Sequence, residues 1–431
     1  MRLRYHPGLS AVALLAGLSL LVSGCGQTSG DDTGEDTPLS MALSFNEPIL
    51  VGDFEDSAAD AYLQTSSEGE VFLSWTDRDP ESESHNNGNA FVARVNPGDQ
   101  QLDETRQMNS HPISGNGGEN LAKFTMGADG SIAAVWPVVG SEHHTGDLEV
   151  AYAERDGAFS PAIPLNDDQE VAKHGYTGIA TAPDGRVFAA WLDGREEVVE
   201  GSEVYMAISE DGGRTYGKNY SVSPAACHCC RPSMVFLDGG ETIVLSYRII
   251  EEGNVRNHVA LRSTDGGKTF GDVIRISDDG WVSHGCPHAG ISIVADSNDG
   301  LHAVWWTGGR SEEEAGIYYT YSGDGGRSFA PRQLISEAPP YIVMHTQVTV
   351  DKDNTLYATW VNVKDEKPHI FVAHRRTGEE EWSEGYQVSD GTLHNFFPVV
   401  TVDDQNVYVA WTERKEEGSR VKLRTAPLLG S

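Results

Sequence analysis

Three of the five cysteines of this chain stand within four consecutive residues, Cys227-His228-Cys229-Cys230. A fourth lies further along the chain, in the segment SHGCPH. Thiolate sulfur and imidazole nitrogen are ligands that copper and zinc prefer in proteins. The two segments therefore predict a transition-metal site, with copper as the first choice and zinc as the second. The expected ligands are Cys227, His228, Cys229, Cys230, His284, Cys286 and His288.

Disulfide bonds are the main alternative for these cysteines, because bridges form readily in exported proteins. A bridge from Cys286 to Cys229 or Cys230 has no obvious strain. A second bridge would join two of the three clustered cysteines, where a separation of one or two residues is expected to strain it. One disulfide beside free or histidine-paired thiols is therefore the first alternative to a metal site, and purely structural disulfides are the second.

The elements that must position these residues follow a repeat of fifty to sixty residues. Each repeat has a turn near Asp-Gly, then alternating apolar residues that end in an aromatic side chain. Alternation of this kind is typical of strands, and an all-strand repeat of this length predicts a β-propeller. We expect seven blades in a single domain, residues 44–431, closed by an N-terminal strand within Ser44–Asp53. The repeated aromatics are Trp75, Trp136, Trp191, Tyr247, Trp306, Trp360 and Trp411.

Three hairpin segments carry a second repeat, SEDGGRTY, STDGGKTF and SGDGGRSF. They resemble the Asp-box, or BNR repeat, of the sialidase superfamily, with Asp211, Asp265 and Asp324 as the boxed aspartates. The resemblance implies a sialidase-like propeller whose boxes lie away from its active face. Because sialidases have six blades, a six-bladed ring is the alternative to seven.

The cysteine segments resemble those of a subgroup of exported bacterial Asp-box proteins. That subgroup has a Cys-x-Cys-Cys motif before one blade and a Gly-Trp…Cys-Pro motif before the next, here CHCC and GWVSHGCPH. The resemblance implies a fold and no particular activity.

Histidines recur at one offset before the Asp-Gly turns of consecutive repeats. Counting back from those turns places His174, His345 and His394 level with the cysteine segments, at the mouth of the axial channel. The first two repeats have Asp60 and Glu119 at this offset. We therefore expect the three histidines to surround the metal site.

A glycosidase or carbohydrate-binding propeller is the second functional hypothesis. Sialidases hold the substrate carboxylate with three arginines, the first in an Arg-Ile-Pro motif, and the nearest match here is Arg231-Pro232, which lacks the isoleucine. In this hypothesis Arg231, Arg248 and Arg310 hold an acidic sugar. A third hypothesis is an envelope scaffold without enzymatic activity, whose rim binds a protein partner.

The first 24 residues resemble a bacterial lipoprotein signal, with a basic start, a short apolar stretch and the lipobox VSGC. The resemblance implies cleavage before Cys25 and lipidation of its thiol, with the outer membrane as destination; an ordinary secretory signal is the alternative. Residues 25–43 are polar and acidic and predict a flexible tether. The net charge of −34 repels nucleic acid, so nucleic acid is not an expected partner.

Overall fold

The computed structural model describes residues 43–429, apart from 56, 80–81, 83, 85, 115–117, 119, 141, 143–144, 197–200, 341–344, 392 and 417. The predicted signal peptide, the predicted lipidation site Cys25 and almost all of the predicted acidic tether lie outside the described residues, as does Glu119. Residues 42–431 form one compact unit. No helix in the described part has the length and apolar character needed to span a bilayer.

Antiparallel strands build almost the whole unit, which confirms the all-β prediction. The first three groups of strands are β2 (Ala59–Thr65), β3 (Val71–Arg78), β4 (Asn86–Asn96), β5 (Gln101–Gln107) and β6 (Ile113–Ser114); β7 (Lys123–Met126), β8 (Ile132–Val139), β9 (Gly146–Ala153) and β10 (Ile163–Pro164); and β11 (His174–Thr181), β12 (Val187–Asp193), β13 (Ser202–Ser209) and β14 (Tyr220–Ala226).

The remaining groups follow the same order. They are β15 (Ser233–Leu237), η1 (Asp238–Gly240), β16 (Thr242–Glu251), β17 (Val255–Ser263), β18 (Ile274–Arg275) and β19 (Trp281–Val282); β20 (Ser292–Ala295), β21 (Leu301–Thr307), η2 (Glu312–Glu314), β22 (Gly316–Ser322) and β23 (Gln333–Glu337); β24 (Thr346–Val350), β25 (Leu356–Lys364), β26 (Lys367–Arg375) and β27 (Tyr386–Gln387); and β28 (His394–Val402), β29 (Asn406–Lys415) and β30 (Gly418–Pro427) with β1 (Ile49–Val51).

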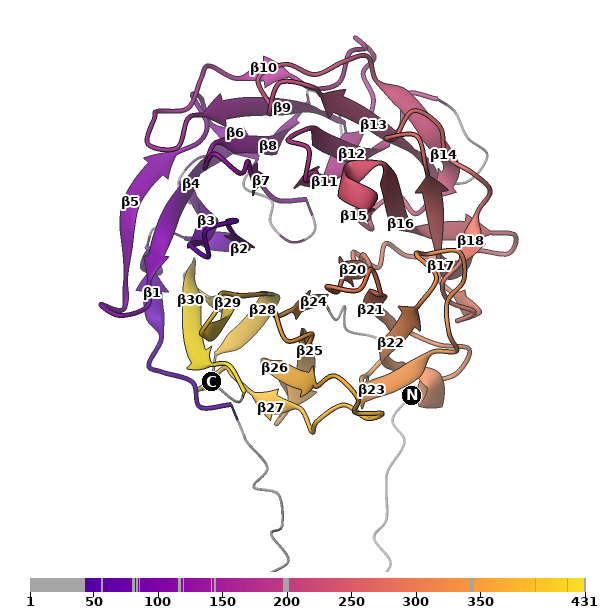
Figure 1. Ribbon diagram of the computed structural model, residues 1–431. Helices are drawn as coiled ribbons and strands as arrows, with labels where there is room; N and C mark the ends of the chain where they lie inside the picture. The colour runs from indigo at the N-terminus through magenta and orange to yellow at the C-terminus, as the bar shows by residue number, and fades with distance from the viewer. Residues whose placement is uncertain are drawn as a thin grey trace, which may run out of the picture. The chain divides into compact units, whose positions relative to one another are not determined.

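The groups form a closed ring, a β-propeller (Figure 1). The innermost strands β2, β7, β11, β15, β20, β24 and β28 contact one another in chain order, and β28 contacts β2. Strand β1 pairs with β30, which confirms closure by the N-terminal strand. A single residue pair, Ala226 with Ile249, joins the β11–β14 and β15–β19 groups into one nine-stranded sheet, so the blade count depends on whether that sheet is divided.

The repeated aromatic residues lie where their spacing predicts. Each is buried in the second strand of its group, where strands of adjacent groups pack against each other. In β12, for example, Phe188, Ala190 and Leu192 join one hydrophobic cluster, while Ala189 and Trp191 join another. Burial on both faces explains why these strands consist almost entirely of apolar residues.

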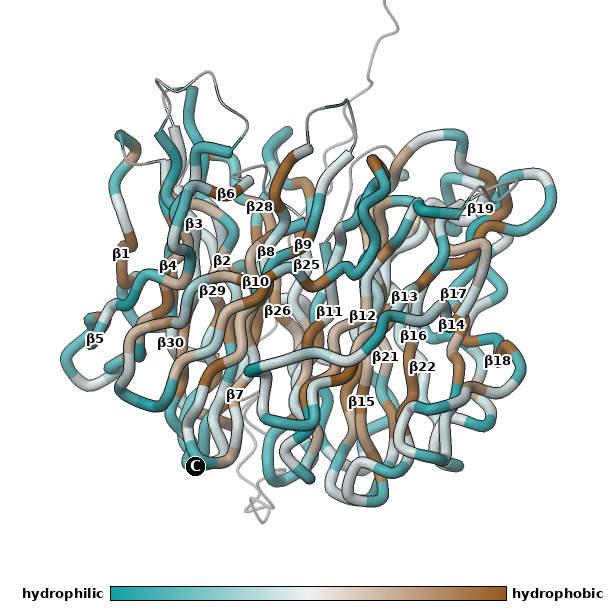
Figure 2. The backbone as a smooth tube through the Cα atoms, turned by 90° about the horizontal axis from the view of Figure 1, so that it is seen from above, coloured by the Kyte–Doolittle hydropathy of each residue, from teal (hydrophilic) through white to brown (hydrophobic). Residues whose placement is uncertain are grey.

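The Asp-boxes close hairpins at the face opposite the cysteines. The Asp211 carboxylate accepts hydrogen bonds from the Thr215 amide (2.9 Å) and the Ser209 hydroxyl (2.7 Å), and Asp265 and Asp324 repeat the pattern. Gly213 has φ 97°, and a Cβ there would lie 2.4 Å from the Ala133 side chain. Strand β13 runs from beside the CHCC loop to the first box, so the two features lie at opposite ends of the strands. Figure 2 shows the strands running between these two loop-built faces.

Candidate metal centre

Two loops at one face of the ring carry the cysteines, and we call this face the cysteine face. The CHCC loop leaves β14 and enters β15, and the Cys227 amide donates a hydrogen bond to the Arg248 carbonyl of β16 (2.8 Å). The HGCPH loop runs from β19 to β20, in the next group of strands. The fold thus brings together two segments that are distant in sequence, as the repeat predicts.

Five of the predicted ligands converge. The sulfurs of Cys227, Cys229 and Cys230 lie within 4.8 Å of one another, and donor atoms of Cys229, Cys286 and His288 form a second group within the same limit. Cys229 belongs to both groups and therefore links the two loops. We call these five residues the cysteine cluster. Four sulfurs and one imidazole nitrogen form a donor set suited to copper(I) or zinc.

All four cysteines of the cluster are free thiols. The Sγ atoms of Cys227 and Cys230 lie 3.3 Å apart, at hydrogen-bonding distance. The loop therefore turns tightly enough to bring these sulfurs together, and the strain expected from their short separation does not keep them apart. The same turn lets one metal ion reach both sulfurs.

The cluster has a buried half and an open half. Cys227, Cys229 and Cys230 are at most 1% exposed, whereas Cys286 and His288 are exposed. Structural metal sites are usually closed, and sites that exchange ligands keep an open side. The arrangement is therefore suited to a metal that enters or leaves from the solvent.

Two buried arginines place positive charge behind the cluster. Arg248 donates to the carbonyls of Ala289 (3.1 Å) and Trp306 (2.8 Å), and Arg256 donates to the Ser283 carbonyl (3.1 Å). Neither forms an ion pair with a carboxylate in the described part of the chain, and the Nη1 atom of each has no hydrogen-bond partner there. Buried Asp279 supplies part of the counter-charge of Arg248, although it is also paired with Arg332 (2.6 Å). Because buried positive charge is costly, an anionic cluster beside the two arginines would stabilise them further.

The thiols respond to this environment in different ways. Hydrogen bonds from Cys229 and Cys230, reinforced by Arg248 and Arg256, hold the pKa of Cys227 well below its usual value. The pKa of Cys229 is raised, first by its hydrogen bond to Cys227. Burial raises the pKa of Cys230. Among the three buried thiols Cys227 is therefore the most readily deprotonated, and a metal ion bound here would displace the thiol protons.

The other two histidines of these loops do not join the cluster. His228 Nδ1 lies 3.1 Å from the Ser202 hydroxyl, and burial lowers the pKa of its imidazole. Its backbone carbonyl accepts a hydrogen bond from Lys173 Nζ (2.8 Å). His284 is exposed and belongs to neither donor group.

The histidines predicted to surround the site lie on the same face but do not converge on the cysteines. His174 is bound between the Gly146 carbonyl (2.7 Å) and Asp168 (3.1 Å), in a separate group with Asp193. His345 packs on Phe397, with ring centres 4.4 Å apart. His394 is exposed beside Phe396. An equal offset in sequence places these residues on one face without directing their side chains to one point.

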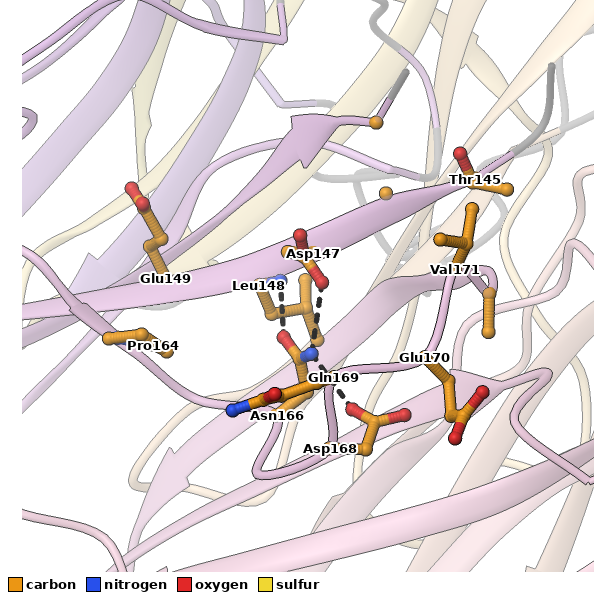
Figure 3. A pocket seen from close by; sticks show the side chains of 13 residues that line it. Thr145, Asp147, Leu148, Glu149, Pro164, Asn166, Asp168, Gln169, Glu170 and Val171 are labelled. Atoms are coloured by element: carbon orange, nitrogen blue, oxygen red, sulfur yellow. Dashed lines mark hydrogen bonds between the residues drawn. The ribbon is translucent and has the colours of Figure 1, made fainter. Parts of the chain in front are cut away.

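The His174 group borders an acidic pocket of about 370 Å³ (Figure 3). Asn166 donates hydrogen bonds there to both Asp147 and Asp168, at 3.0 Å each. Asp193 is neutralised by Arg195 (2.9 Å) and also accepts a hydrogen bond from the Trp191 indole. These groups satisfy one another, which is typical of a structural network.

The three arginines of the glycosidase hypothesis occupy different places. Arg231 lines an axial cavity of about 350 Å³, together with Lys123 and several hydroxyl and amide side chains. Arg248 is fully buried behind the cysteine cluster. Arg310 is half exposed and paired with Asp278 (2.9 Å). The structure therefore does not gather them into one carboxylate-binding group.

Two residues that lie beside the cluster, Tyr176 and Lys173, were not predicted from the sequence. The Tyr176 hydroxyl lies 3.3 Å from His288 Nδ1, and Lys173 Nζ lies 4.8 Å from the centre of the Tyr176 ring. Lys173 directly precedes β11, and Tyr176 lies near the start of this strand, where the register shifts between Gly175 and Gly178. The only local sign was the pair of glycines around Tyr176, which is typical of a bulge.

Two polysaccharide lyases among the solved structures support the fold, and a sialidase is also similar at a lower TM-score. A PL25 ulvan lyase is 11% identical, with 88% of this chain and 96% of that chain covered and a TM-score of 0.55. The polysaccharide lyase Uly1 is 13% identical, with 88% and 91% covered and a TM-score of 0.53. The Hadza microbial sialidase Hz136 is 14% identical, with 83% and 76% covered and a TM-score of 0.48. No protein-family model and no curated protein matches the sequence.

Proposed function

We propose that this protein binds copper(I) in the cysteine cluster and handles the metal outside the cytoplasm, anchored to the outer membrane by a lipid on Cys25. The observation that carries the proposal is the convergence of four thiols and one imidazole from two separate loops. Two buried arginines support it, because their positive charge favours an anionic group at this place and neither forms an ion pair with a carboxylate among the described residues.

The donor set favours copper(I) over zinc. Thiolates are soft ligands that suit copper(I). Zinc in a structural site requires a closed tetrahedral shell. Here Cys286 and His288 remain exposed, so the shell is open on one side.

The division into buried and open halves supports metal handling. An incoming ion meets the exposed pair Cys286 and His288 first. Cys229, which belongs to both groups, then connects this pair to the buried sulfurs. Transfer from one half to the other needs only ligand exchange at a shared cysteine, and no redox step.

Competition titration tests the proposal. The full chain, purified anaerobically, is titrated with copper(I) against a chromophoric copper(I) chelator. We expect one tightly bound ion per chain and a loss of at least tenfold in affinity for Cys229→Ser. The Tyr357→Phe variant is the matched control, since it removes a buried hydroxyl group in β25, outside the cluster. Equal affinity of the Cys229→Ser and Tyr357→Phe variants would contradict the proposal.

Carbohydrate binding is the second candidate, carried by the axial cavity. Arg231 and Lys123 give this cavity positive charge in a strongly acidic protein, and Tyr62, Gln64, Thr65 and other polar side chains line it. Such a cavity suits an acidic sugar. Arg231→Ala should abolish binding of an acidic oligosaccharide measured by calorimetry while leaving copper binding unchanged; equal sugar binding by this variant and the wild type would reject the candidate.

A further inference from the structure

Tyr176 reaches the cysteine cluster from a group of strands that supplies none of its five residues. It stands near the start of β11, and its side chain is almost completely buried. Its hydroxyl oxygen lies 3.3 Å from His288 Nδ1, and the two rings have their centres 5.9 Å apart. The contact therefore joins β11 to the loop that precedes β20.

Both partners of this contact have unusual backbone conformations. Tyr176 has φ 57° and His288 has φ 47°, in the left-handed region that side chains other than glycine rarely adopt. The Tyr176 amide donates to Asn120 Oδ1 (2.7 Å), which holds the bulge in place. Strained residues of this kind persist where the surroundings fix them and gather at functional sites.

Lys173, which directly precedes β11, contacts the CHCC loop. Its ammonium group lies over the Tyr176 ring at 4.8 Å and donates to the His228 carbonyl at 2.8 Å. The start of β11 thus contacts the CHCC loop through Lys173 and the HGCPH loop through Tyr176. The two halves of the cysteine cluster are held against one common support.

We propose that Tyr176 is a positioning residue that sets the tautomer of His288. The imidazole donates its Nδ1–H to the Tyr176 oxygen, so Nε2 keeps the lone pair that binds the metal. Ligating histidines commonly donate their second ring N–H to an orienting group in this way. The role in metal binding rests on the copper site proposed above, while the tautomer itself is a property of the metal-free protein.

Tyr176→Phe tests this role because it keeps the ring and removes only the hydroxyl. We expect copper(I) to bind about tenfold more weakly to this variant, the lower end of the usual effect of such orienting groups. X-ray absorption at the copper edge should show loss of the imidazole nitrogen. The matched control is Tyr357→Phe, which removes a buried hydroxyl bound to Asp351 at 3.3 Å, far along the chain in β25. Its affinity should equal that of the wild type.

A double variant separates positioning from packing. If Tyr176 acts through His288, then adding Tyr176→Phe to His288→Ala should cost no further affinity. A further tenfold loss in the His288→Ala background would overturn the proposal, as would wild-type affinity for Tyr176→Phe alone.

Nitrogen NMR of the metal-free chain tests the tautomer independently of copper. With ¹⁵N-labelled histidine, the His288 ring should carry its proton on Nδ1 in the wild type and shift toward Nε2 in Tyr176→Phe. An Nε2–H tautomer in the wild type would overturn the proposal. A wild type that shows the Nδ1–H tautomer but binds no copper would support the role of Tyr176 and contradict the proposed function instead.

Discussion

Replacing Arg248 by methionine tests whether the buried charge behind the cluster is structural. Arg248 makes charged hydrogen bonds to two buried carbonyl oxygens, those of Ala289 and Trp306. Each such bond contributes about 1.5–3 kcal/mol, and methionine regains part of this by filling the space. We expect Arg248→Met to lower the free energy of unfolding by about 4 kcal/mol.

That loss converts to a measurable change in melting temperature. A folded unit of this size unfolds with an entropy of about 0.8 kcal/mol per kelvin, so the melting temperature should fall by about 5 °C in a calorimetric scan. The matched control is Arg310→Met, since Arg310 is half exposed and forms a surface ion pair with Asp278. Pairs of that kind contribute less than about 1 kcal/mol, or about 1 °C.

The physical cause of this loss of stability is tested by introducing Arg248→Met into a chain that already carries Cys227→Ala. If Arg248 neutralises the Cys227 thiolate, then Cys227→Ala leaves the arginine without its counter-charge. Arg248→Met should then cost about 1–3 kcal/mol less than it does in the wild type. A melting temperature for Arg248→Met as high as that of Arg310→Met would refute the assignment, and strict additivity with Cys227→Ala would refute its electrostatic basis.

Further predictions concern the cluster, the pH dependence, the hairpins and the N-terminus. Cys229→Ser should weaken copper(I) binding more than Cys286→Ser, because Cys229 belongs to both donor groups; equal losses in chelator competition would contradict a shared ligand. His258, whose pKa burial and Arg248 lower to about 4, stays neutral in the folded chain and is protonated in the unfolded chain below about pH 6.5. Its contribution to stability is therefore complete above pH 6.5 and should be lost by about 1.4 kcal/mol per pH unit down to pH 4. His258→Gln should flatten the dependence of the melting temperature on pH between 7 and 4.5, and an unchanged slope would count against it. Asp211→Ala should lower the melting temperature by about 2 °C through loss of the Asp-box hydrogen bonds, with unchanged copper content. Cys25→Ala should move the protein from the membrane fraction to the soluble fraction of cells, and retention at the membrane would contradict lipid anchoring.

The fold could be predicted from the sequence because its determinants are local and repeated. The buried aromatic of each second strand recurs at regular spacing, and the Asp-box turns carry their own hydrogen-bond pattern. The closing strand β1 followed from the missing fourth strand of the last group. Such features depend on short stretches of chain, which the sequence displays directly.

The site could be predicted only in part. The propeller repeat correctly placed Cys229 and His288 on one face, and the short CHCC spacing kept three thiols together. The direction of each side chain depends on the backbone at the start of its strand. Bulges and positive φ angles at Tyr176 and His288 are set by tertiary contacts, so the sequence did not show that these two residues meet.

The burial of the Arg248 guanidinium could not be predicted from the sequence either. Arg248 was predicted to hold an acidic sugar. In the folded chain it lies within β16, and its guanidinium turns into the interior, toward the Ala289 carbonyl. Which way an arginine side chain turns depends on the neighbouring group of strands, and the sequence does not show that packing.

Elemental analysis of the full chain, purified anaerobically from cells grown with copper, tests the central claim most directly. Mass spectrometry of the metal, with titration of free thiols on the same sample, should find close to one copper ion per chain in the wild type. The ion should be absent in Cys229→Ser and present in Tyr357→Phe. A chain that carries no metal and no reactive thiol would contradict the account, and the cysteines would then be disulfide-bonded residues of a propeller whose function lies in its axial cavity.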